Sequence, residues 1–543
     1  MTQSPKSVIP RFAGLLLSAW LAVLPLQGAK APAVSKLAKD AGPIIEMSPF
    51  EVRAQSMEFD RWIKMESPHF LIYTDASTKE ATRLLKEMEM VHQAAQFYFK
   101  RKAMKRAKRI VVLPTGKSDW RKLASKGGVE WAVASSLTGQ TRELLLVQYD
   151  WQEDGLGAVW SMAGHSEIAG MNIDGPFWFR RGVARFFGTV EFTHDTLTIG
   201  KESDYSAAII RQGWMPWDQY FSITARSPEF TKDTPLLHQF EGQSAVFTHY
   251  FLTSSDPAGA ARLLAWAAYL EAGNPPTKES FKELFGVDWS EWETLSMRIL
   301  KGGTYTTGVI RFPPAALNFP VTKLDLSVRE MRELFILSQI MNQRTKESDT
   351  SLDALLLKGL KTESLREVLA DACDSRSRNA ECLIQQRALI AAGTTNQAVY
   401  TAAATAVFKA SIKELSPDAR LGDATEEIRS WCTKALALEP LDVQANETLA
   451  WTEALAPTVG KSNLDSIARI CRTLDGTAPT DQALAALAVA RWRAGANAQA
   501  RALCERIDIS VFTRKSARGI VHELLAKLDA GESPNPTATL TPP

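Results

Sequence analysis

The spacing of apolar residues divides the chain into a front part that mixes strands with helices and a rear part that is helical throughout. Residues 69–74 form an apolar, β-rich run, and residues 77–100 place apolar side chains at helical spacing. Two more apolar runs, at 109–114 and 143–149, predict further strands. We therefore expect a small mixed sheet covered by helices.

From residue 156 to residue 305 the pattern becomes helical. One helix is predicted over 156–168, and a second begins near Pro176, with Asp174 as its cap. Further helices are predicted over 243–252 and 258–272, and Gly286 is expected to end another. The front part is therefore predicted to be α+β, with the strands first and the helices after them.

A Pro-rich segment separates the front part from the rear part. Residues 311–323 contain three prolines, and almost everything beyond them has the Ala- and Leu-rich pattern of helices. Within the rear part the sequence repeats at an offset of 39 residues, and in each copy Pro ends one helix and Asp can cap the next. The coinciding positions are Ile428 with Ile467, Cys432 with Cys471, Pro440 with Pro479, and Asp442 with Asp481.

The first 31 residues have the layout of a secretory signal peptide. Lys6 and Arg11 precede an apolar run at 12–26, and small residues ending at Ala29 or Ala31 follow it. The run is shorter than the roughly 20 residues that a membrane-spanning helix needs. The sequence thus predicts a secreted or periplasmic protein, with membrane association only if the signal stays uncleaved.

Composition and charge narrow the classes of function. Of the 543 residues, 45% are apolar and 23% are charged, which is typical of a folded globular protein. Lys and Arg (63) exceed Asp and Glu (61) by only two. Because so small a net charge gives no strong positive field, we expect no nucleic acid as a partner.

Cysteines and tryptophans are distributed unevenly between the two parts. Twelve of the fifteen tryptophans lie before residue 310, and all five cysteines lie after it. In an oxidising compartment Cys373 and Cys382 could form a disulfide, and two free buried thiols are the alternative. The pairing stays open for the full set, which is Cys373, Cys382, Cys432, Cys471 and Cys504.

Residues 160–187 carry the pattern most relevant to chemistry. They predict a helix, a short loop and a second helix that opens with Pro176-x-Trp178 and contains a Gly-x-Ala step at Gly182. This segment resembles the peptidase-MA-like domain, a gluzincin-type metallopeptidase domain common in exported bacterial proteins. The resemblance extends over about 60–310 and includes the segments 67–75, 243–250 and 281–286. The unit at 431–450 resembles a tetratricopeptide-type helical hairpin.

The metallopeptidase resemblance implies a fold, while the residues at the motif positions argue against the activity. Zinc hydrolysis needs a His-Glu-x-x-His helix and a third ligand from the next helix. In the register set by Pro176, Ser161 stands where the first His belongs and Met162 where the Glu base belongs. His165 takes the second His position, and Arg181 replaces the third ligand. We therefore predict no catalytic residues and no metal or other cofactor. The alternative is an active zinc peptidase with atypical ligands.

The same positions offer a binding hypothesis. Arg181 and Arg185 are four residues apart on one helical face, so with His165 they could line a cationic pocket for a carboxylate or phosphate. The plainer alternative is that His165 is a hydrogen-bonded core residue and that the arginines form a solvated basic face.

Together these observations predict an exported, non-catalytic binding or scaffold protein. Its fold class is an α+β gluzincin-like domain followed by an all-α helical-repeat domain that binds a peptide or protein. Another alternative is an envelope protein that uses the repeats only for assembly. The predicted units are a signal peptide (1–31), a linker (32–58), the peptidase-MA-like domain (59–310), a Pro-rich linker (311–329), tetratricopeptide-like repeats (330–530) and a disordered tail (531–543).

Overall fold

The structure of the chain is a computed structural model. The structure describes residues 59–100, 107–115, 134–147, 155–171, 173, 175–201, 206–224, 227, 235–254, 256–302, 306–342, 345–412, 414–474, 481–508 and 515–534. These residues belong to one of the chain's two compact units, Glu58–Pro543. The predicted signal peptide (1–31), the whole of the first linker (32–58) and the tail beyond residue 534 lie outside the described residues.

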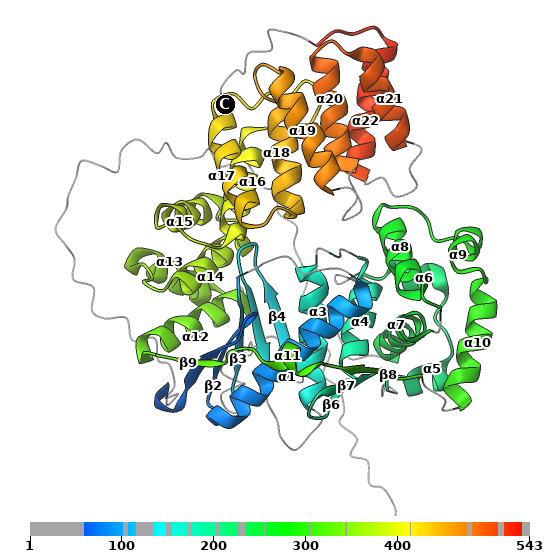
Figure 1. Cartoon of the computed structure of the whole chain (residues 1–543), viewed down its shortest axis with the longest axis vertical. Coiled ribbons are helices and arrows are strands. Elements are labelled where there is room, and N and C mark those ends of the chain that lie inside the picture. The colour runs from blue at the N-terminus through cyan, green and yellow to red at the C-terminus, as the bar shows by residue number, and fades with distance from the viewer. Residues whose placement is uncertain are drawn as a thin grey trace, which may run out of the picture. The chain divides into compact units, whose positions relative to one another are not determined.

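The described front part contains a mixed sheet of six strands in the order β4-β5-β3-β2-β1-β9. Figure 1 labels β4, β3, β2 and β9 of this sheet. Strands β2, β3 and β5 run parallel to one another, and β1, β4 and β9 pair antiparallel at the two sides. The strand bounds are β1 (Ile63–Glu66), β2 (Phe70–Thr74), β3 (Arg109–Leu113), β4 (Ala134–Thr138), β5 (Glu143–Val147) and β9 (Thr322–Leu324). Three of these strands match the predicted apolar runs.

The continuous apolar runs form the centre of this sheet. Their residues can be apolar throughout because both faces of the central strands are covered. Every residue of β2 and β3 is buried, as expected for parallel strands between helices. Helix α1 (Thr78–Phe99) begins at Ser77 with a reciprocal capping box to Glu80, and its apolar face packs on the sheet. Strands β1, β4 and β9 were not predicted because their sequences, Ile-Lys-Met-Glu, Ala-Ser-Ser-Leu-Thr and Thr-Lys-Leu, mix polar with apolar residues and form no continuous apolar run.

Helices make up most of the remaining front part, and a second described sheet has the order β6-β7-β8. Large aromatic side chains fill the core there, with Trp178, Trp266 and Trp292 fully buried. The elements are α3 (Gly155–Gly170), α4 (Phe177–Phe187), β6 (Glu191–Phe192), β7 (Thr196–Ile199), α5 (Ser206–Gln212), α6 (Trp217–Ser222), α7 (Pro235–Thr253), α8 (Gly259–Glu271), α9 (Lys278–Phe285), α10 (Trp289–Gly302) and β8 (Gly308–Arg311).

The predicted end of α9 agrees with the structure, and the predicted start of α4 differs from it in its cap. Gly286 ends α9 in the left-handed conformation, at φ +79°, as predicted. Helix α4 instead has Pro176 itself at the N-cap, without a side-chain cap, and the expected cap Asp174 lies outside the described residues. Proline can begin this helix because its missing N–H is one that the first turn would leave unpaired.

The Pro-rich segment 311–329 does more than connect two parts. It contains the short helix α11 (Pro314–Leu317) and strand β9, and β9 pairs with β1 through Met65 and Lys323. The chain therefore returns to the first sheet before it enters the rear part. Local composition could not reveal this pairing, because its partner lies more than 250 residues earlier.

The rear part consists of helices, in agreement with the predicted layout of an α+β part followed by an all-α part (Figure 1). Asp442 caps α18 by accepting the backbone N–H of Ala445 at 3.0 Å, as the repeat pattern predicted. The helices are α12 (Val328–Asn342), α13 (Lys346–Lys358), α14 (Glu363–Ser375), α15 (Asn379–Ala391), α16 (Gln397–Ser411), α17 (Ala424–Leu438), α18 (Val443–Ala454), α19 (Lys461–Leu474), α20 (Asp481–Arg493), α21 (Asn497–Asp508) and α22 (Lys515–Asp529).

None of the five cysteines, all of which are described, forms a disulfide, and four of them are buried. Of the two alternatives for Cys373 and Cys382, the structure has the free thiols. Burial raises the pKa of Cys373 to about 11 and that of Cys382 to about 12. Because the thiolate is the reactive form, both side chains behave as small apolar groups at neutral pH. Within the described ranges, no helix is long and apolar enough to span a membrane.

Candidate functional site

The motif positions chosen from the sequence lie on two helices that pack together, α3 and α4. The hydroxyl of Ser161 faces Gly188 so closely that a Cβ there would overlap it. Met162 packs against the front core. His165 is half-buried, and burial lowers its pKa; the charge of Glu143 opposes this effect, while Arg180 and Arg181 add to it. These surroundings favour a neutral imidazole at His165.

Arg181 and Arg185 already hold a carboxylate of the chain itself. Both extend from α4 to Glu241 of α7, with Nε of Arg181 2.6 Å from Oε1 and Nε of Arg185 2.8 Å from Oε2. Burial alone would raise the pKa of Glu241, but the two guanidinium groups outweigh it and hold that pKa below its usual range. An external anion at these arginines would have to compete with Glu241, which the sequence analysis did not identify.

A metal centre requires several His, Cys, Asp or Glu side chains that converge on one point. Among them, no group of three or more His, Cys, Asp or Glu residues is arranged so that it could hold a metal ion. The arrangement around His165 fits this finding, since arginines stand beside it.

A buried polar network lies on the sheet side of α3, and the sequence analysis missed it. Glu167 is fully buried and accepts from Arg109 Nη1 at 2.6 Å, while its other oxygen lies 2.7 Å from His92 Nδ1. Burial would raise the pKa of Glu167, yet Arg109 and His92 together lower it. Arg109 also lies 3.4 Å from Glu143, which accepts the hydroxyl of Ser166. The network joins α1, α3, β3 and β5.

A second histidine extends this network toward the surface. The His69 ring stacks on the His92 ring with 3.9 Å between centroids, and its Nδ1 lies 2.7 Å from Oε2 of Glu89. Glu89 also accepts the hydroxyl of Ser67 at 2.7 Å. Every group in this network has a hydrogen-bond or ion-pair partner. The network therefore holds the ends of β2, β3 and β5 against α1 and α3.

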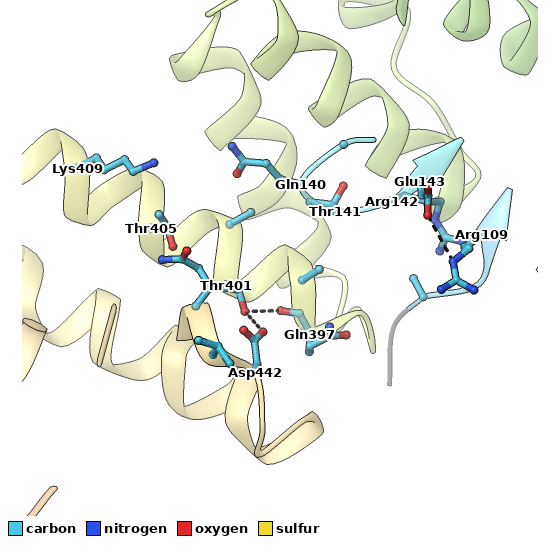
Figure 2. Close-up of a pocket in the computed structure, with 16 residues that line it drawn as sticks. Arg109, Gln140, Thr141, Arg142, Glu143, Gln397, Thr401, Thr405, Lys409 and Asp442 are labelled. Atoms are coloured by element: carbon cyan, nitrogen blue, oxygen red, sulfur yellow. Dashed lines mark hydrogen bonds and ion pairs between the residues drawn. The ribbon is translucent and has the colours of Figure 1, made fainter. Parts of the chain in front are cut away.

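The candidate site is a pocket of about 350 Å³ where the ends of β3, β4 and β5 meet helices α16 and α18, and we call it the junction pocket (Figure 2). Arg109 and Glu143 connect it to the buried network. Its lining also includes amide, hydroxyl and ammonium groups. The lining residues are Ala107, Arg109, Gly139, Gln140, Thr141, Arg142, Glu143, Gln397, Ala398, Thr401, Ala402, Thr405, Lys409, Asp442, Val443 and Gln444.

One wall of the junction pocket is the β4–β5 turn, and α14 holds it in place. Asp371 accepts the backbone N–H groups of Thr141 and Arg142, each at 2.9 Å, and the Thr141 hydroxyl at 2.9 Å. Arg142 forms an ion pair with buried Glu367. Asn396 bridges the two sides, since its amide donates to Thr141 O and to Glu367 Oε1, both at 2.9 Å.

Burial raises the pKa of Asp371 to about 7, although the N–H groups and hydroxyl that it accepts lower it, and the charge of Glu367 adds to the rise. This joint fixes the turn relative to α16.

The opposite wall is one face of α16. Gln397, Thr401, Thr405 and Lys409 follow at intervals of four, so they form a polar stripe along the helix, and Figure 2 shows their side chains along the pocket. The other residues of α16 are mostly Ala, Val and Phe, which the helix buries. This stripe is visible in the sequence as a four-residue polar period in an apolar helix, and it could have indicated the site.

The chemistry of the lining favours hydrogen bonding over proton transfer. The charges of Arg109 and Arg142 are matched by Glu143, Glu167 and Glu367. Asp442 is engaged by the Thr401 hydroxyl at 2.7 Å and by its cap bond. The amide of Gln397 and the ammonium of Lys409 have no described partner, and the other amides and hydroxyls of the lining offer a ligand only the bonding capacity that their bonds within the chain leave.

Comparison of the chain with models of protein families, with curated proteins and with solved structures found no match.

Proposed function

We propose that this chain is an exported, non-catalytic binding protein that holds an extended peptide segment in the junction pocket. In this proposal the front part has a gluzincin-like fold that has lost its zinc chemistry, and the rear part is a tetratricopeptide-like array. The array supplies α16 and α18 as one wall, and the sheet supplies the β4–β5 turn as the other.

The observation that carries this proposal is the polar stripe of α16 inside a formed pocket. A volume of about 350 Å³ lies in the range of small-ligand and peptide subsites. The hydroxyl and amide groups of the stripe can both donate and accept hydrogen bonds, which suits a peptide main chain. The β4–β5 turn, which faces the stripe, is held by Asp371, Glu367 and Asn396. Because this wall is already ordered, binding of a peptide loses little conformational entropy of the protein.

The motif positions support a non-catalytic role. Ser161 and Met162 stand where a ligand and a base would be needed, and Arg181 pairs with Glu241. A guanidinium group stays protonated and cannot coordinate a cation. These observations support binding as the function of the chain.

A peptide-display selection tests the proposal. Purified residues 32–543 are used to select binders from a random heptapeptide library, and the best peptide is synthesised for a fluorescence-anisotropy titration. Ala398→Trp fills the pocket from α16 and should weaken binding at least tenfold. Ala410→Trp is the matched control, because Ala410 is exposed on the same helix outside the pocket lining, and it should leave the Kd unchanged. Failure to select any peptide, or equal binding by Ala398→Trp, would overturn the proposal.

The zinc-peptidase alternative is tested in the same preparation. Protein purified without chelator is measured for zinc and incubated with fluorescein-labelled casein. We expect neither stoichiometric zinc nor chelator-sensitive cleavage. About one zinc per chain together with cleavage that a chelator stops would contradict a non-catalytic role.

A further inference from the structure

Gln397 is a largely buried residue of the junction pocket whose side-chain amide has no described hydrogen-bond partner. It is 4% exposed and lines the junction pocket. Its backbone C=O lies 3.2 Å from the Thr401 hydroxyl, which donates to Asp442 at 2.7 Å, and its side-chain amide has no hydrogen-bond partner among the described residues. The amide is not among the fully buried side-chain atoms that lack a partner, so it remains accessible from the pocket. A polar group that is accessible there and has no bond to the chain is available to a ligand.

The other polar groups of the pocket differ from Gln397 in this respect. Thr405 is 3.3 Å from the Thr448 hydroxyl, and the Gln444 amide donates to the same hydroxyl at 3.3 Å. The Gln140 amide donates to Asp374 at 3.1 Å. These bonds are made without a ligand. The two N–H donors and the carbonyl acceptor of the Gln397 carboxamide have no such bond.

The chemistry of Gln397 indicates which part of a peptide it would contact. A carboxamide and a peptide group have the same donor and acceptor, so they can form a pair of hydrogen bonds side by side. Such a pair does not depend on the side chains of the ligand. We infer that Gln397 recognises the main chain of an extended segment, so the junction pocket selects for unfolded or extended polypeptide and tolerates many sequences. This inference rests on the proposed peptide binding and specifies its ligand class.

The stripe also indicates the length of the segment and the charge preferred at one of its ends. Twelve positions separate Gln397 from Lys409, and at about 1.5 Å per residue they lie roughly 18 Å apart along α16. An extended peptide rises about 3.3 Å per residue, so roughly five residues span that distance. Lys409 forms no ion pair with another described residue, which favours a neutral or acidic residue at that end of the segment.

The test compares two matched substitutions in the full mature chain. Gln397→Met keeps the length of the side chain and removes the amide, and Gln444→Met makes the same change where the amide is already bonded to Thr448. With the heptapeptide selected above as probe, Gln397→Met should raise the Kd at least tenfold and Gln444→Met less than threefold. Thermal unfolding of Gln397→Met should be unchanged or slightly raised, which separates lost recognition from lost folding.

A second arm tests main-chain recognition directly. A series of the same heptapeptide, with each peptide N–H methylated in turn, should bind the wild type at least tenfold more weakly at one position or two adjacent positions. Gln397→Met should no longer distinguish the series at that position. If the wild type binds the probe but Gln397→Met binds equally well, this inference is overturned while the proposed function stands. If the wild type binds no heptapeptide, the proposed function itself fails.

Discussion

Asp371 accepts two hydrogen bonds from Thr141, one from its backbone N–H and one from its hydroxyl, each at 2.9 Å. The two residues are 230 positions apart and join the β4–β5 turn of the front part to α14 of the rear part. The same turn forms a wall of the junction pocket. The geometry of the pocket therefore depends on this buried carboxylate.

Gly139 makes the close approach of the turn possible. A methyl group at this position would overlap the Asp371 carboxylate. We expect Gly139→Ala to destabilise the chain by roughly 1–3 kcal/mol, since either the turn or the carboxylate has to move. Urea denaturation measures the change. Gly519→Ala in α22 is the control, because a methyl group there meets no atom within 4 Å and should stabilise the helix by up to about 1 kcal/mol. Equal stability of Gly139→Ala and wild type would contradict the packing of the turn.

The stability of the chain should depend on the protonation of Asp371. Its pKa is raised to about 7 in the folded chain from 3.8, so between about pH 4 and pH 7 the folded state binds more protons than the unfolded state. The free energy of unfolding contributed by this group should therefore fall as the pH rises through that window and level off above it. The full change is on the order of 4 kcal/mol, at about 1.4 kcal/mol per pH unit.

Asp371→Asn isolates this contribution. The variant is expected to be less stable than wild type, because its amide NH₂ would face a backbone N–H. The difference in unfolding free energy between wild type and variant should narrow from pH 4 to pH 7. A difference that stays constant across this range would show that Asp371 does not titrate there.

Glu241 is expected to anchor α7 to α4. Glu241→Gln removes the charge that Arg181 and Arg185 share and should destabilise the chain by roughly 2 kcal/mol. The loss is below the 3–5 kcal/mol of fully buried pairs because the Arg181 side chain is 36% exposed. Since the pKa of Glu241 is lowered, its contribution should be present above about pH 4.5 and disappear as the pH falls through the folded pKa. Thermal unfolding at pH 7 and pH 3 compares the two proteins, and an equal loss at both pH values would contradict the ion pairs.

Restoring the motif tests the register of the resemblance to metallopeptidases. The triple variant Ser161→His, Met162→Glu and Arg181→Glu supplies the missing ligands and base beside His165. It should bind about one zinc per chain and gain thermal stability when zinc is added. Arg181→Glu alone is the control, since it places a second carboxylate beside Glu241 and should only destabilise. A triple variant that binds no metal would count against the register.

The sequence predicted the elements that depend on local pattern. The apolar runs gave β2, β3 and β5, helical spacing gave α1 and α7, and Gly286 ended α9 as expected. The repeat of 39 residues predicted the cap at Asp442. In each case the signal lies within a few residues of the element.

The partners that define the site lie far apart in the chain. Arg181 was interpreted without Glu241, which is 60 positions later, and no local pattern connects Thr141 with Asp371. The charge of a cluster depends on such tertiary partners, so the proposed anion pocket at His165 and Arg181 could not be assessed from α4 alone. Buried polar groups also break the apolar periodicity that marks a core. For this reason the sequence pattern did not predict that Glu167 and Gln397 are buried.

Amide hydrogen exchange with the selected heptapeptide tests most directly whether the junction pocket is the binding site. The exchange rates of the mature chain are compared with and without saturating peptide, and Ala398→Trp serves as the control. We predict slower exchange in the first turns of α16 and in the β4–β5 turn at residues 139–143, and no change in Ala398→Trp. Protection confined to α3 and α4 around His165 and Arg181, with none in α16, would contradict the account.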